Sequence, residues 1–244
     1  MPKSRQLLFK ENKINLQPSN AAEFLSLLND PKCTMAPFVT TLLLNFSRYL
    51  YNPASPSPID ELAQCLVDKC TGLTFLKFLG PGPPNLSLLT GLSSSITHLE
   101  LLDNLPGWGR EVSAEAGAIL DVVGNFTVLE VLTMYYDTPG RGMGDDPISP
   151  IYNPHITKLP SSLPRLRRLE LDVIWNAFLP WFLLSGVLNF PGLETMELNL
   201  ACYPFPVALP LLQSFLNLYS SSVRNLILRL MWWTLPGEKR CLRI

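Results

Sequence analysis

The chain has 244 residues, of which 47% are hydrophobic and 16% are charged, and its formal net charge is -1. This composition excludes an intrinsically disordered chain, which lacks the apolar residues needed for a core. The missing basic excess argues against a dedicated nucleic-acid-binding protein. We therefore expect a folded domain with a large hydrophobic core.

Neither a signal peptide nor a membrane-spanning helix is predicted. Lys3 and Arg5 lie near the N-terminus without an apolar region behind them. The most apolar stretch, residues 177–190, contains Pro180 and is shorter than the roughly 20 residues that a spanning helix needs. The five cysteines have no framework spacing, which is typical of a reducing compartment. We expect an intracellular protein, cytoplasmic or nuclear, with unpaired thiols and no membrane contact.

One short pattern recurs along the chain: an apolar residue, two spacers, a second apolar residue, one spacer and a third apolar residue. In LRRLEL the last two apolar residues are two positions apart, so they share one face of an extended strand. Each copy, termed a repeat phrase, therefore predicts one strand. The seven copies begin at Val39, Leu73, Ile96, Leu129, Leu166, Leu193 and Val223.

Between the repeat phrases, the apolar spacing changes to that of a helix. Strand, turn, helix and return strand form the unit of a parallel sheet, and stacking such units buries a shared core. We predict one α/β domain, with a degenerate unit or cap in residues 1–38, including a strand around Leu7 and Phe9, and seven or eight irregular repeats in total. The predicted helices cover residues 21–28, 59–70, 113–123, 178–188 and 209–219.

Two segments depart from this plan. Residues 137–165 form a long loop rich in Gly and Pro, and such loops are often functional or mobile. We favour the simpler interpretation, a disordered insertion that replaces one helix. At the C-terminal end, Trp232 and Trp233 follow the last predicted strand without a polar capping unit. This end is expected to expose core, which implies either a missing C-terminal portion or a covering partner.

The repeat phrases resemble the leucine-rich-repeat signature L-x-x-L-x-L over residues 39–230. The long irregular periods and the segments SSSITHLEL, SLPRLRRLEL and FPGLETMEL are similar to the repeat half of fungal F-box proteins. The resemblance implies a horseshoe-shaped solenoid with a parallel sheet on the concave face and helices on the convex face. Residues 1–38 lack the Leu-Pro start of an F-box, so the resemblance implies the substrate-binding half alone.

Spacers that flank the inward leucines are expected on the concave surface of the predicted sheet. We hypothesise that Phe75 and Tyr135 anchor a target protein, while Glu170, Asp172 and Glu197 set charge selectivity. The alternative is that the chain's own loops cover these spacers. The candidate protein-binding residues are Leu43, Phe75, Lys77, Leu79, His98, Glu100, Val131, Tyr135, Arg168, Glu170, Asp172, Glu197 and Arg229.

No catalytic, cofactor or metal site is predicted. His98 and Glu100 form only a loose constellation, and a solvated histidine explains His98 better. Cys65 and Cys70 are five apart in a predicted helix, without the spacing of a zinc hook, so they are interpreted as core residues. Asp137, Asp145 and Asp146 are interpreted as solvated loop acids rather than a cation site.

The sequence thus predicts a non-catalytic protein-interaction module. It resembles the substrate-recognition region of an F-box-type ubiquitin-ligase adaptor, whose partners would be an unknown target protein and, if a longer form carries an F-box, a Skp1-type subunit. A free-standing leucine-rich-repeat scaffold or inhibitor without a ubiquitin connection is the alternative. An enzyme that uses residues 137–165 is a third possibility.

Overall fold

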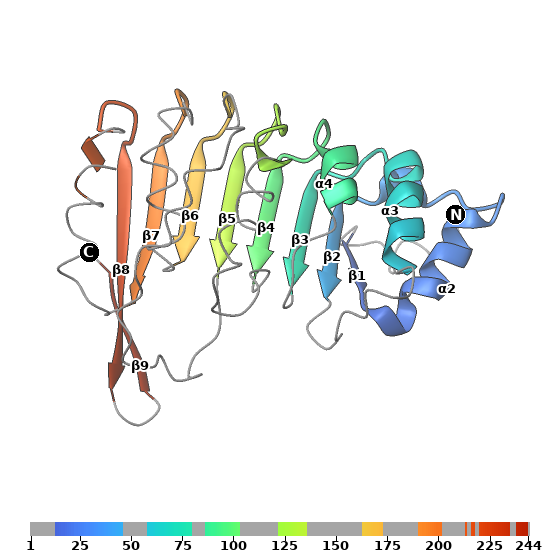
Figure 1. The fold of residues 1–244 in the computed structure, drawn as a ribbon, viewed down its shortest axis with the longest axis horizontal. Helices are drawn as coiled ribbons and strands as arrows, with labels where there is room; N and C mark the ends of the chain where they lie inside the picture. The colour runs from blue at the N-terminus through green and yellow to red at the C-terminus, as the bar shows by residue number, and fades with distance from the viewer. Residues whose placement is uncertain are drawn as a thin grey trace, which may run out of the picture.

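The strands of this protein form one open sheet whose spatial order is the order of the sequence (Figure 1). The computed structural model describes residues 13–45, 58–79, 86–102, 122–135, 163–172, 190–201, 213, 216–217, 220–234 and 238–243. Strands β1 to β8 are parallel, and β9 pairs antiparallel with β8. The strands are β1 (Lys13–Leu16), β2 (Thr41–Asn45), β3 (Phe75–Leu79), β4 (His98–Leu102), β5 (Val131–Tyr135), β6 (Arg168–Asp172), β7 (Thr195–Ala201), β8 (Asn225–Thr234) and β9 (Glu238–Arg243).

Each of the seven predicted strands is confirmed, and each begins at the third residue of its repeat phrase. A recurring pair of backbone hydrogen bonds aligns the phrases. The carbonyl of Thr40 accepts the N–H groups of Thr74 and Phe75, both at 3.0 Å, and the corresponding carbonyls of later phrases do the same as far as Asn225. The phrases therefore lie at one register across the sheet.

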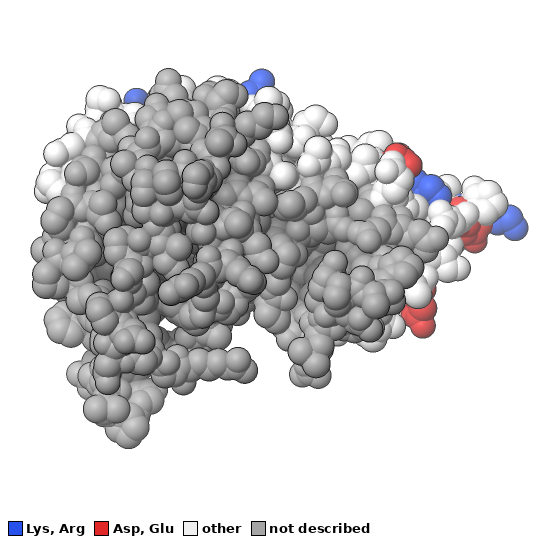
Figure 2. Space-filling model, viewed as in Figure 1, with Lys and Arg blue, Asp and Glu red and all other residues white. Residues whose placement is uncertain are grey.

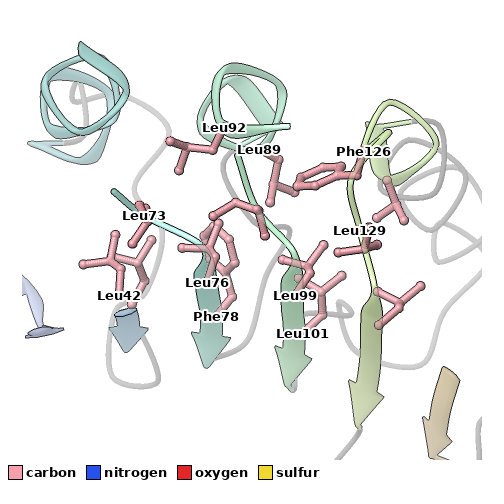
Figure 3. Close-up of a cluster of buried hydrophobic side chains, with 14 of the residues drawn as sticks. Leu42, Leu73, Leu76, Phe78, Leu89, Leu92, Leu99, Leu101, Phe126 and Leu129 are labelled. Carbon is pink, nitrogen blue, oxygen red and sulfur yellow. The ribbon is translucent and has the colours of Figure 1, made fainter. Parts of the chain in front are cut away.

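The apolar positions of the repeat phrases form the core. In the first six phrases, the first, fourth and sixth residues are all buried. Figure 3 shows Leu76 and Leu99 of the strands packed beneath Leu89 and Leu92, with Phe126 beside them. Full burial of a leucine side chain contributes about 1.5–3 kcal/mol, so this repeated packing is the main stabilising interaction of the sheet.

A further set of core residues was not predicted, apart from its member Cys70. It lies three residues before a repeat phrase, and each member's carbonyl accepts the N–H of the first residue of the phrase. The resulting turn points an apolar side chain into the core next to that first residue. Its members are Ala36, Cys70, Phe126, Leu163 and Phe190, all buried.

Three helices pack in sequence order along the core side of the sheet: α2 (Pro18–Asn29), α3 (Pro58–Lys69) and α4 (Leu86–Leu92). The predictions at residues 21–28 and 59–70 are confirmed with small shifts of their ends. Helix α2 begins earlier because Pro18 suits the first helical position and the Asn20 side chain accepts the Gln17 N–H at 2.7 Å. The Lys69 Nζ atom donates to the carbonyl of Leu28 at 2.6 Å and so caps the other end of α2.

Helix α4 and the short 3-10 helix η1 (Ala36–Phe38) were not predicted. At seven residues, α4 is too short to produce a helical stripe that sequence analysis can recognise. The predicted strand at Leu7 and Phe9 and the predicted helix at residues 178–188 lie outside the described residues, as does most of the 137–165 loop. Only the last two residues of 113–123, and residues 213, 216 and 217 of 209–219, are described, and all are helical.

The prediction that Trp232 and Trp233 follow the last strand is wrong. Both belong to β8, which continues to Thr234, and β9 covers the outer edge of its second half. In the last repeat phrase, Leu226 occupies the fourth position, which is buried in the six earlier phrases. This residue is nevertheless 39% exposed.

The described surface mixes the two signs of charge. In Figure 2 the visible Lys, Arg, Asp and Glu atoms gather mainly at the end of the molecule that carries α2, with blue and red atoms side by side. No large single-sign patch is formed by the described residues in this view. None of the described helices has the length and apolar character required to cross a membrane.

The backbone at Gly72 lies close to the carbonyl group of Pro37, so we expect that a residue with a Cβ atom cannot replace this glycine without loss of stability. A Cβ atom there would overlap the carbonyl oxygen of Pro37, whereas at Gly192 it would lie 3.3 Å from that of Pro164. We expect Gly72→Ala to lower the free energy of unfolding by about 1–3 kcal/mol, and Gly192→Ala to lower it by clearly less. Urea unfolding of the two variants is the measurement, and equal losses would contradict this account.

The buried thiol of Cys70 predicts a loss of stability at alkaline pH. Burial, reinforced by Cys65 and Cys33, raises the pKa of Cys70 from 9.0 to about 11. The folded state therefore holds the thiol proton more tightly, and this stabilisation is complete below pH 9 and lost as the pH rises towards 11. Unfolding midpoints measured across this window should fall more steeply in the wild type than in Cys70→Ala. Parallel curves for the two proteins would refute the prediction.

Candidate protein-binding surface

The spacer residues of the repeat phrases form the second face of the sheet, opposite the core. In strands β2, β3 and β4, buried residues alternate with residues of intermediate exposure, so successive side chains point to opposite faces. The third, fifth and seventh residues of the phrases thus make a surface, termed the open face. The register places its middle row in the order Leu43, Lys77, Glu100, Thr133, Glu170, Glu197 and Ile227.

The N-terminal half of the open face is mixed in character. The rings of Phe75 and His98 stack with centroids 6.1 Å apart and an interplanar angle of 20°. In the next row, Lys77 Nζ lies 2.7 Å from Glu100 Oε2, and these side chains are 28% and 25% exposed. Leu43, Leu79 and Val131 are partly buried around them. An aromatic and aliphatic surface thus surrounds one ion pair.

The C-terminal half carries a connected polar group, termed the ion network: Thr133, Arg168, Glu170, Glu197 and Arg229. Thr133 Oγ1 donates to Glu170 Oε2 at 3.3 Å, and Arg168 Nε pairs with Glu170 Oε1. Arg168 Nη2 donates to Glu197 Oε2 at 3.2 Å. Arg229 Nη2 lies 2.6 Å from Glu197 Oε1. The network therefore joins strands β5, β6, β7 and β8 through their side chains.

Exposure is divided unequally between the acids and the bases of the ion network. The side chain of Glu197 is 1% exposed and that of Glu170 is 12% exposed, whereas Arg168 and Arg229 are 45% and 39% exposed. Of the three acids that we hypothesised to set charge selectivity, Glu170, Asp172 and Glu197, the structure shows that Glu170 and Glu197 are largely covered. Long arginine side chains lie over the shorter acids and neutralise them, so the groups that reach solvent are guanidinium groups.

Glu197 is the central residue of the ion network. Its Oε2 atom accepts an aligned hydrogen bond from Arg168, but Oε1 has no aligned donor although Arg229 is in ion-pair distance. A buried carboxylate without compensating charge is destabilised by several kcal/mol. The two arginines therefore have to remain close to Glu197, which fixes their position on the open face.

The structure brings together most, but not all, of the predicted site residues. Leu43, Phe75, Lys77, Leu79, His98, Glu100, Val131, Arg168, Glu170, Glu197 and Arg229 all lie on the open face. Tyr135 and Asp172 occupy the ends of β5 and β6, and their side chains lie outside the described part of the chain. Thr133, a spacer of the same face, was not among the candidate binding residues. Its position beside Glu170 follows from the register between two phrases, which no single phrase contains.

His98 and Glu100, the pair considered for acid–base chemistry, each contact another residue. His98 Nδ1 lies 2.9 Å from Thr97 Oγ1, while Glu100 pairs with Lys77, so the loose constellation considered from the sequence is not formed. Cys65 and Cys70 are buried, as predicted, and within the described ranges no group of His, Cys, Asp and Glu could hold a metal ion. Asp137, Asp145 and Asp146 lie outside those ranges.

The two types of ion pair on the open face should differ in strength. A double-mutant cycle with Glu197→Gln and Arg229→Gln should give a coupling of about 1–3 kcal/mol, because the carboxylate is buried. The matched cycle with Lys77→Gln and Glu100→Gln should give less than about 1 kcal/mol, because both side chains remain in contact with water. Both couplings come from urea unfolding, and similar values would contradict the importance of burial.

Comparison of the chain with protein-family models, curated proteins and solved structures found no match. A function for the open face therefore has to be argued from its own geometry.

Proposed function

We propose that this protein is a non-catalytic interaction module that binds a target protein on the open face. We interpret its architecture as a leucine-rich-repeat solenoid, as the resemblance of its phrases implies. Eight parallel strands in sequence order, with helices along the other side, are the arrangement expected when repeat units stack on their neighbours. In such folds the extended sheet surface is the usual binding face.

The observation that carries the proposal is the chemistry of the open face. Phe75, Leu43 and Val131 are partly exposed on it, and charged groups beside them are already paired with one another. Protein interfaces combine apolar and aromatic anchors with polar groups whose hydrogen bonds are satisfied. This combination favours a protein partner over a small polar substrate.

Within this class, we propose the substrate-recognition role of an F-box-type adaptor. The chain would then hold a target protein while other subunits carry out ubiquitin transfer. In that case a Skp1-type subunit would bind a segment other than the open face. A free-standing scaffold is the second candidate, and recovery of the target without a Skp1-type subunit would favour it.

Replacement of Phe75 provides the test. Affinity purification with the wild-type chain, followed by mass spectrometry, first identifies the target. We then expect Phe75→Ala to weaken target binding by about 30-fold, because loss of an aromatic anchor typically costs about 2 kcal/mol or more. Isothermal titration calorimetry with the purified target gives the affinity.

Phe38→Ala is the matched control, because Phe38 is 60% exposed in η1 and is not a spacer residue of the open face. Its affinity should equal that of the wild type, and circular dichroism should show that both variants are folded. A folded Phe75→Ala variant with unchanged affinity would refute the open face as the binding site. Tyr135→Ala tests the second hypothesised anchor in the same assay.

A further inference from the structure

Within the ion network, the charged side chains that reach furthest into solvent are the two arginines. Glu197 is 1% exposed and Glu170 is 12% exposed, whereas Arg168 and Arg229, which pair with them, are 45% and 39% exposed. A guanidinium group has five N–H donors. The contacts to Glu170 and Glu197 occupy only part of this number, so with respect to the described residues both arginines keep further N–H groups that could bind a ligand.

These donors are positioned before any ligand binds. Arg168 and Arg229 contact opposite oxygens of the same Glu197 carboxylate, so their guanidinium groups are held next to each other. Arg168 is further fixed by Glu170. Ordering a long side chain on binding costs about 0.5–1.5 kcal/mol. This cost is reduced here, because Glu170 and Glu197 already hold the two arginine side chains in the folded chain.

Resting on the proposed function, we infer that the open face recognises an acidic segment of the target protein. A carboxylate of that segment accepts hydrogen bonds from Arg168 and Arg229, in the planar geometry that guanidinium groups favour. An apolar side chain of the same segment contacts Val131 and the Phe75–His98 stack. This proposed preference is opposite to the charge selectivity that we hypothesised from the acids Glu170, Asp172 and Glu197 in the sequence.

The spacing of the strands allows one short peptide to contact Arg168 and the apolar residues at the same time. The register aligns Phe75, His98, Val131 and Arg168 in one row across β3, β4, β5 and β6. Neighbouring strands are about 4.8 Å apart, so the apolar contacts lie roughly 5–15 Å from Arg168. A peptide of a few residues that crosses the strands spans this distance.

The balance of charge favours a protein over a nucleic acid. Among the described residues, the ion-paired side chains on the open face are three bases, Lys77, Arg168 and Arg229, and three acids, Glu100, Glu170 and Glu197. Binding to a phosphate backbone depends on a surplus of bases that displaces many counterions. A single carboxylate requires only local N–H donors, and these are present.

A peptide selection tests the inference. Random peptides displayed on phage are selected against the full chain, and we expect enrichment of Asp or Glu close to an apolar residue. A selected peptide is then synthesised with its acidic residue and with the Gln or Asn counterpart. Loss of the carboxylate should weaken binding to the wild type by roughly tenfold, the effect of one charge-assisted hydrogen bond.

The chain variants localise the effect. In the double variant Arg229→Gln/Glu197→Gln, both members of an ion pair are removed together, so no buried charge is left unpaired. This variant keeps Arg168, which Glu170 still holds, so its preference for the acidic peptide over the amide counterpart should be clearly smaller than tenfold. Arg167→Gln removes one arginine at an exposed neighbouring position and should keep the tenfold preference. Circular dichroism confirms that each variant is folded.

The possible failures can be told apart. Peptides that need Phe75 but show no acidic preference would overturn this inference and leave the proposed function standing. If no peptide is selected, or if the selected peptides bind Phe75→Ala and the double variant as tightly as they bind the wild type, both the inference and the proposed function would be overturned. Binding of a single-stranded oligonucleotide probe that the double variant loses would also overturn it, in favour of phosphate recognition.

Discussion

The common register of the repeat phrases is the constraint on which the rest of this structure depends. One carbonyl in each phrase accepts two N–H groups of the next phrase, from Thr40 through to Asn225. A shift by one residue would move every apolar side chain to the opposite face. Because the leucines have to be buried together, only one register is stable, and the rows of the open face follow from it.

The same register explains why charges gather where they do. Arg168, Glu170, Glu197 and Arg229 come from three different phrases, and they meet because β6, β7 and β8 are adjacent and aligned. Their unequal length then decides which of them reaches water. The shorter acids remain near the sheet, and the arginines extend over them. A surface that looks acidic in composition therefore presents guanidinium groups.

Much of the fold could be predicted, because the strand signal is local. The spacing of leucines within LRRLEL is enough to indicate a strand and its buried face, and the helical spacing of residues 59–70 indicates α3. The turn residues three positions before a phrase were missed, apart from Cys70, since their role appears only when the turn closes over the core. Helix α4 was missed because it is short, and β9 because its antiparallel partner lies in the extended end of β8.

The sequence by itself determined the number and direction of most strands, their buried residues, and the face on which candidate binding residues lie. These properties depend on periodicity, which each phrase contains in full. Only the tertiary structure decided the burial of Glu197, the exposure of Arg168 and Arg229, and the stacking of Phe75 on His98. The physical reason is that exposure and pairing depend on neighbouring strands, and those neighbours are about 23 to 37 residues away along the chain.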